Sequence, residues 1–194
     1  MIRACSGGDI STIDAVINRA AQAYKGVIPA DCWHEPYMPR TELLTAIAAG
    51  VRFWGWHDPT PEDPQSLLGV MGIQPVRNPA GNGEGATLIR HAYVLPGHQS
   101  RGIGTALLRA LIEQWQKQSA EPSIATSGSQ PIQNSRPRLL VGTWAAAEWA
   151  IRFYERHGFR LVPTAEKDRV ADAYYKIPSR QREASVVLAY VDNR

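Results

Sequence analysis

Apolar residues recur with helical spacing in several segments of the chain. Between residues 102 and 118 they line up on one face, a pattern typical of an amphipathic helix. A second such stripe predicts a helix over residues 9–23, and the segments 40–49 and 145–158 are predicted as helices that end at Gly50 and Gly158. The apolar stripes consist of Ile10, Ile13, Val16, Ile17 and Ala20 in the first helix, and of Ile103, Leu107, Leu108, Leu111, Ile112 and Trp115 in the longest one.

Shorter apolar runs between these helices have the length of β-strands. The runs at 51–57 and 67–76 are separated by a polar, Pro-rich turn and predict an antiparallel hairpin. A further turn leads into a long strand over 86–95. The remaining strands are expected at 2–5, 138–144, 159–162 and 183–191. Strands that are interspersed with helices in this order indicate a mixed α/β fold.

One long segment, 119–137, is rich in Ser, Pro and Gln and has no periodicity. We interpret it as a flexible internal loop, because too few residues follow it to build an independent second core. The whole chain, residues 1–194, is therefore predicted to form a single domain.

Composition excludes several classes of protein. With 44% hydrophobic and 20% charged residues the chain is globular rather than disordered. The net charge is only +3 and the basic residues are scattered, which argues against nucleic acid as a partner. No segment is apolar enough to span a membrane or to act as a signal peptide. Cys5 and Cys32 are too few for a disulfide framework and lack metal-ligand spacing, so we expect a cytoplasmic protein without a metal.

The stretch HQSRGIGTALLRAL, residues 98–111, places Gly102 and Gly104 between the end of a predicted strand and the start of a helix. Such a loop presents free backbone N–H groups to an anion. A Walker loop would need a Lys that this stretch lacks. A dinucleotide-binding loop would need a third glycine at position 107, which is Leu107, and an acidic residue near position 124, which is Ile124.

The remaining pattern, Gln99-Ser-Arg-Gly-Ile-Gly104, resembles the acyl-CoA loop of the GNAT superfamily of N-acetyltransferases. Alone, the glycines could simply mark the entry to a helix. A second block, AIRFYERHGF at 150–159, resembles the other signature of that family and lies about fifty residues downstream, as the family order requires. The two blocks and the strand at 86–95 carry the resemblance over about residues 86–160.

This resemblance implies a mixed, mostly antiparallel central sheet flanked by helices. The central strand, 86–95, and the strand at 138–144 are expected to diverge into a V. It also implies acetyl-CoA as co-substrate, with its pyrophosphate on the loop amides. The residues implied to bind it are Val94, Leu95, Gln99, Ser100, Arg101, Gly102, Ile103, Gly104 and Thr105, with a backbone N–H near Val94 polarising the thioester carbonyl and Arg101 adding positive charge.

The resemblance further implies that Tyr154 acts as general acid toward the departing thiolate. The general base stays open. Where the family often carries a Glu on the central strand, this chain has Leu88 or Arg90, and neither can act as a base. His91 on the same strand is one candidate, because imidazole is the usual base near neutral pH. Glu84, Glu35 and His34 compete with it, and Ala147 stands where the family often has an Asn that contacts the cofactor.

The function implied is transfer of an acetyl group from acetyl-CoA to a primary amine by direct attack in a ternary complex. The acceptor is a small-molecule amine or a peptide amine, and the resemblance also allows a homodimer. Trp33 and Trp144 fall where the family builds its acceptor site, whereas Trp115 and Trp149 are predicted as core. The alternative is a non-catalytic acyl-CoA-binding regulatory domain, which the missing carboxylate favours.

Overall fold

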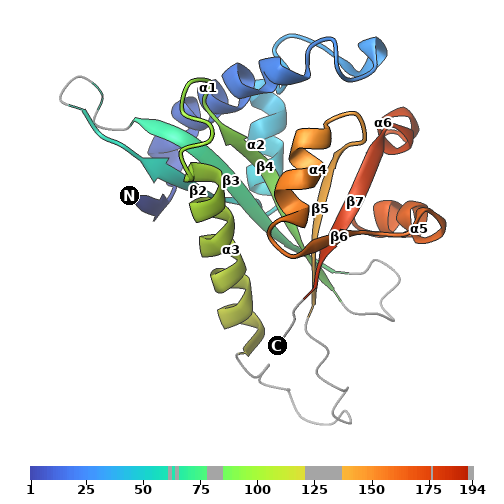
Figure 1. Ribbon diagram of the computed structural model, residues 1–194. Coiled ribbons are helices and arrows are strands. Elements are labelled where there is room, and N and C mark those ends of the chain that lie inside the picture. Colours follow the sequence, from blue (N-terminus) through green and yellow to red (C-terminus); the bar gives the residue numbers. More distant parts are fainter. Residues whose placement is uncertain (61–62, 64–65, 78–84, 121–136, 176, 192–194) are drawn as a thin grey trace.

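The computed structural model describes residues 1–60, 63, 66–77, 85–120, 137–175 and 177–191. Its strands form a seven-stranded sheet in the order β1-β2-β3-β4-β5-β7-β6 (Figure 1). The strands are β1 (Ile2–Ala4), β2 (Arg52–His57), β3 (Leu67–Val76), β4 (Ala86–Val94), β5 (Arg138–Trp144), β6 (Phe159–Leu161) and β7 (Ser185–Tyr190). β4 and β5 pair in parallel and the other neighbours pair antiparallel, so the predicted mixed, mostly antiparallel sheet is confirmed.

Helices flank this sheet on both sides (Figure 1). They are α1 (Ile10–Ala21), α2 (Arg40–Ala48), α3 (Ile103–Ala120), α4 (Glu148–Glu155), α5 (Thr164–Tyr174) and α6 (Ser179–Glu183). α1 packs on β3 and β4, while α3 packs on β2, β3 and β4. The stripes predicted from the sequence form these contacts, since Ile13 and Ile17 of α1 and Leu107 and Leu111 of α3 are at most 1% exposed. No helix in the described ranges is long and apolar enough to cross a membrane.

β4 and β5 separate after a short paired stretch. Their pairing runs from Ala86 opposite Arg138 to Ile89 opposite Val141 and includes no later residue, although both strands continue. The predicted V is therefore confirmed. It opens toward the end of β4 from which the glycine loop leads into α3.

A β-bulge lies in β4 beside this split. Val70 of β3 pairs with Tyr93, but Gly72 pairs with Arg90, so β4 has one residue more than β3 in this interval. His91 lies in the bulge with φ of 50°, in the left-handed region that non-glycine residues seldom adopt. The extra residue shifts the alternation of side chains along β4.

Two sequence predictions fall mostly outside the described residues. The predicted flexible loop at 119–137 is one of them, although its first two residues, 119 and 120, belong to α3. Glu84, a candidate base, is the other.

Candidate functional site

Two cavities meet at the split between β4 and β5. The larger one, of about 810 Å³, lies beside the glycine loop, and the smaller one, of about 410 Å³, lies between the α1–α2 segment and the α5–α6 segment. Both are lined by Tyr24, Ile89, His91, Tyr93, Gly142 and Thr143. A molecule in the larger cavity can therefore approach a molecule in the smaller one through the split.

The loop from β4 to α3 forms one wall of the larger cavity. Gly97 and Gly102 have φ of 81° and Ser100 has φ of 60°, so three loop residues adopt the left-handed conformation. The amide of Ala106 donates to the Gly102 carbonyl at 2.9 Å, which leaves the amides of the preceding helical turn without an intrahelical acceptor. A Cβ added at Gly102 would meet no atom within 4 Å. Open space in front of free amides at a helix N-terminus suits a phosphate group.

Most of the residues predicted to bind the cofactor line this cavity. They are Val94, Gln99, Ser100, Gly102, Ile103, Gly104 and Thr105. The other two, Leu95 and Arg101, do not line it. Leu95 follows β4 directly and is buried, and its amide donates to the Leu68 carbonyl of β3 at 2.9 Å. Arg101 is exposed and donates to Nδ1 of His98 at 3.2 Å, while Arg156, which the sequence analysis did not name, lines the cavity instead.

The backbone of Val94 faces the split. Hydrogen-bonded pairs alternate along antiparallel strands, and Leu95 is bonded to Leu68. The neighbouring pair of Val94 and Gly69 is therefore not hydrogen-bonded, and the N–H and C=O of Val94 point away from β3. Nε2 of Gln99 donates to this carbonyl at 3.5 Å. The N–H is directed into the opening where β5 no longer pairs with β4.

Tyr154 of α4 also lines the larger cavity and is 5% exposed. Its ring lies 5.2 Å from the ring of Phe153 and 5.6 Å from that of Phe159. Phe159 is fully buried, so the Gly-Phe pair of the sequence motif supports Tyr154 from the core. Burial is the main cause that raises the pKa of Tyr154 above its ordinary value, and the phenol consequently stays protonated at neutral pH.

His157 joins the end of α4 to the start of α3. Nδ1 lies 2.7 Å from the Phe153 carbonyl oxygen, which can only accept, so Nδ1 carries a proton. Nε2 lies 3.1 Å from Oγ1 of Thr105. The contact fixes the first turn of α3 beside the larger cavity. Sequence reasoning missed it, because nothing in the spacing of residues 105 and 157 signals their contact.

His91 lines both cavities. Its ring stacks on Phe53 at 5.8 Å, and its Nε2 is buried without a hydrogen-bond partner in the described part of the chain. Burial, and to a lesser extent the charge of Arg90, lower the pKa of the imidazole to about 3. The ring is therefore neutral at physiological pH, with a nitrogen available at the junction of the cavities.

The other candidate bases are less well placed. Glu35 is exposed, accepts from Nζ of Lys25 at 2.9 Å and lines neither cavity. His34 is exposed on the smaller cavity, and its Nδ1 donates to the Pro36 carbonyl at 2.7 Å.

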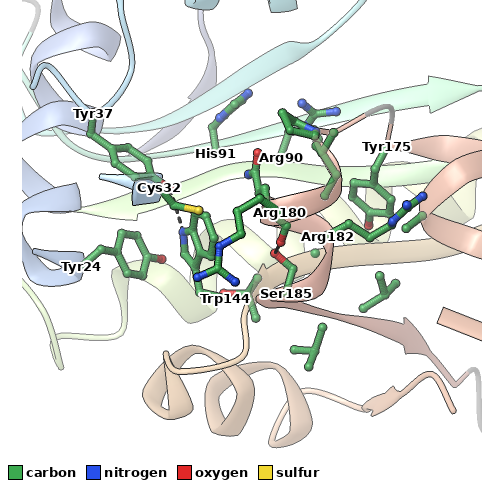
Figure 2. Close-up of a pocket in the computed structure, with 18 of the residues that line it drawn as sticks. Tyr24, Cys32, Tyr37, Arg90, His91, Trp144, Tyr175, Arg180, Arg182 and Ser185 are labelled. Atoms are coloured by element: carbon green, nitrogen blue, oxygen red, sulfur yellow. Dashed lines mark hydrogen bonds between the residues drawn. The ribbon is translucent and has the colours of Figure 1, made fainter. Parts of the chain in front are cut away.

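Three tyrosines that the sequence analysis did not name surround the split. The Tyr24 ring lies 5.8 Å from that of Tyr37 and 6.3 Å from that of Tyr93. Nε1 of Trp144 donates to Oη of Tyr37 at 2.8 Å, as the dashed line in Figure 2 marks. Burial raises the pKa of all three phenols, that of Tyr24 to about 12. The junction is thus lined by polar but uncharged groups.

The tryptophans divide differently from the prediction. Trp144 lines the smaller cavity, as expected for an acceptor site, but Trp33 packs on Tyr37 without lining it. Trp115 is buried as predicted. The prediction that Trp149 is core is wrong, because the side chain is 47% exposed and stacks on Tyr24 beside the larger cavity. The described residues contain no cluster of side chains that could hold a metal ion.

Comparisons with known proteins agree with this architecture. The family model for the acetyltransferase (GNAT) domain matches residues 51–161, more than half of the chain. The chain therefore belongs to the GNAT acetyltransferase family, whose chemistry is acyl transfer from acetyl-CoA. No curated protein matches the sequence.

Solved structures share the fold at low sequence identity. A GNAT-family acetyltransferase from Staphylococcus aureus Mu50 is 15% identical with a TM-score of 0.63, covering 98% of this chain and 97% of that one. A ribosomal-protein-alanine N-acetyltransferase from Brucella melitensis is 16% identical with a TM-score of 0.61, covering 99% of both. NAA60 of Arabidopsis thaliana, solved in complex with acetyl-CoA, is 16% identical with a TM-score of 0.60, covering 100% of this chain and 99% of that one.

Proposed function

We propose that this protein transfers an acetyl group from acetyl-CoA to a primary amine, by direct attack of the amine in a ternary complex. The observation that carries the proposal is the meeting of two cavities at the split between β4 and β5. A donor in one cavity and an acceptor in the other would be in contact without a covalent enzyme intermediate. The C–N bond forms as the C–S bond breaks, and the proton lost by the amine balances the thiolate that departs.

The hydrogen-bond donors in the wall of the larger cavity suit the phosphate groups of CoA. The free amides of the first turn of α3 and the open space at Gly102 would receive the pyrophosphate, and Arg156 would add positive charge. Acetyl-CoA supplies an activated thioester when bound. The N–H of Val94, which faces the split, would donate to the thioester carbonyl oxygen where negative charge develops.

His91 and Tyr154 handle protons in this proposal. Nε2 of His91 accepts a hydrogen bond from the attacking amine, which orients the lone pair of the nitrogen. Because the pKa of His91 is about 3, the ring does not lose this capacity through protonation above about pH 5. Tyr154 stays protonated and donates to the departing sulfur. Both groups line the larger cavity, and His91 lies where it meets the smaller one.

A non-catalytic acyl-CoA-binding domain is the second candidate. The observation in its favour is that β4 has the buried Leu88 and the cation Arg90 at the positions where a carboxylate was expected from the resemblance. A domain that only binds acyl-CoA would need the larger cavity but not the smaller one.

Incubation with acetyl-CoA and a panel of primary amines tests the proposal. We expect one free thiol to be released for each acetylated amine, measured by a thiol reagent and by mass spectrometry. The rate should fall at low pH as the amine becomes protonated. Tight binding of acetyl-CoA without thiol release from any amine would refute the proposal and favour the regulatory domain.

A further inference from the structure

The smaller cavity is lined by four lysine and arginine side chains, and three of them lie near a carboxylate. Arg180 contacts Asp31 at 2.7 Å, Arg182 contacts Asp172, and Lys167 lies 3.8 Å from Asp168. The fourth is Arg90. It has no carboxylate within ion-pair distance among the described residues. These basic groups all line the cavity (Arg90, Lys167, Arg180 and Arg182).

Arg90 is held in place by a neutral group. Its guanidinium donates to Oε1 of Gln74 at 3.2 Å, and Nε2 of Gln74 donates to the Ala49 carbonyl at 2.9 Å. Gln74 is only 8% exposed. Burial lowers the pKa of Arg90, and Tyr175 and the carboxylate of Glu42, which both line the cavity, oppose this effect only in part. A guanidinium stays charged under these conditions, so the cavity wall holds a positioned positive charge that no carboxylate contacts directly.

Tyr175 presents a second polar group to the same cavity. Its Oη is buried and has no hydrogen-bond partner in the described part of the chain. The ring fits against Gly142, where an added Cβ would approach it to 3.0 Å. Figure 2 shows Tyr175 and Arg90 in the wall of this cavity, which they reach from the end of α5 and from β4. An unpartnered buried hydroxyl is costly unless a ligand completes its hydrogen bonds.

The cavity is also bounded on its outer side. Arg180 of α6 forms two hydrogen bonds to Asp31, of 2.7 Å through Nε and 3.3 Å through Nη2. These bonds connect the segment before α2 with the segment before β7, and both residues line the cavity. A volume of about 410 Å³ suits a small molecule better than a protein chain.

We propose that the amine substrate is a small molecule that carries a compact anion, such as a carboxylate, and that Arg90 and Tyr175 bind this anion. The inference rests on the proposed acyl transfer, since it names the acceptor for that reaction. Arg90 forms the ion pair, Gln74 positions its guanidinium, and Oη of Tyr175 donates a hydrogen bond to the anion. The amine then extends along β4 toward His91 and the split. Arg90 and Tyr175 are specificity-determining residues in this arrangement.

Calorimetry on the full chain saturated with CoA tests the anion site without requiring turnover. The probes are matched acids and amides: glycine and glycinamide, β-alanine and β-alaninamide, γ-aminobutyrate and its amide. 2-Aminoethylphosphonate distinguishes a phosphonate from a carboxylate. We expect at least one anion to bind about tenfold tighter than its neutral counterpart, the range for one charge-assisted pair. Amides that bind as tightly as the acids at every length, or no binding by any anion, would overturn the proposal.

Substitutions of the cavity residues test whether Arg90 and Tyr175 bind the anion. Arg90→Gln should abolish the preference for the anion and leave the affinity for the amide within about twofold, and Tyr175→Phe should reduce the preference about fivefold. Arg160→Gln removes the same charge from an exposed position on β6 that lines neither cavity, and should keep the preference. A preference that survives in folded Arg90→Gln, or that is lost in Arg182→Gln instead, refutes the assignment. Thermal melts verify folding, and Tyr175→Phe decides the question if Arg90→Gln does not fold.

The two proposals can fail separately. Acetylation of acids and amides at equal rates would refute the anion site while acyl transfer stands. A clear preference for acids in calorimetry, with no thiol released from any amine, would refute acyl transfer while the anion site stands.

Discussion

Replacement of His91 by Asn should make the stability of the protein less sensitive to acid. The substitution removes a titratable ring from the junction of the two cavities. Asn is the appropriate replacement because His91 has φ of 50°, and Asn tolerates the left-handed region better than most residues. A change in pH dependence can then be assigned to the imidazole rather than to backbone strain.

The expected magnitude follows from the shift in the pKa of His91. Its value is about 3 in the folded protein and 6.5 in the absence of the fold. Between these values the unfolded chain binds a proton that the folded protein does not, so stability falls as the pH drops from 6.5 toward 3. At pH 5, about 1.5 pH units below the ordinary pKa, the loss amounts to about 2 kcal/mol at about 1.36 kcal/mol per unit.

Urea unfolding at pH 7.5 and pH 5.0 measures this difference. From pH 7.5 to pH 5.0, the unfolding free energy of the wild type should fall by about 2 kcal/mol more than that of His91→Asn. The other histidines are present in both proteins and cancel in the comparison. Asp9 does not contribute at pH 5, because its pKa lies below its ordinary value of 3.8. Equal losses in the two proteins would show that the imidazole is solvated and protonated normally, which would remove the basis for a neutral hydrogen-bond acceptor.

Three further substitutions test the glycine loop before α3, the role of Tyr154 as general acid, and the ion pair between Arg3 and Asp9. Gly102→Val should weaken binding of acetyl-CoA about 100-fold or more in calorimetry. The control is Gly97→Val, because Gly97 has the same φ of 81° but does not line the larger cavity, and this variant should weaken binding less than about tenfold. Equal effects would argue against a phosphate site at Gly102. Tyr154→Phe should lower kcat about 100-fold with little change in the KM for acetyl-CoA, and an unchanged kcat with rate-limiting chemistry would leave Tyr154 as a packing residue. Asp9→Asn should lower the unfolding free energy by about 2–4 kcal/mol in urea titrations at pH 7, because Asp9 is buried and paired with Arg3 at 2.7 Å. The difference from wild type should shrink below about pH 4. A loss below about 1 kcal/mol at pH 7 would contradict this account.

The sequence was sufficient to predict a helix where that helix buries an apolar stripe against the sheet. α1 and α3 lie within a few residues of their predicted bounds, because their stripes face the sheet. α5 and α6 were not predicted. In α5, TAEKDRVADAY, only Val170 and Ala171 are buried, so the segment has no stripe to detect. Its packing against β7 is a tertiary contact that local periodicity does not encode.

The candidate site was predictable to the extent that it is local. The glycine loop is contiguous, and its amides face a cavity as the strand–loop–helix pattern indicates. The contact of His157 with Thr105 and that of Trp144 with Tyr37 join residues 52 and 107 positions apart, which no short motif reports. The exposure of Trp149 was not predicted for a related reason, because the ring on which it stacks, Tyr24, comes from the distant segment after α1.

The bulge in β4 brings two consecutive residues, Arg90 and His91, to the same cavity. Arg90 and His91 are consecutive and would face opposite sides of a regular strand, yet both line the smaller cavity. The extra residue in β4 and the left-handed φ of His91 account for this shared orientation. One cavity thus receives a cation and a neutral imidazole whose pKa the cation helps to lower. Such a pair disfavours a cationic ammonium and favours a neutral amine on a molecule that brings its own negative charge, which is the class of acceptor that we propose.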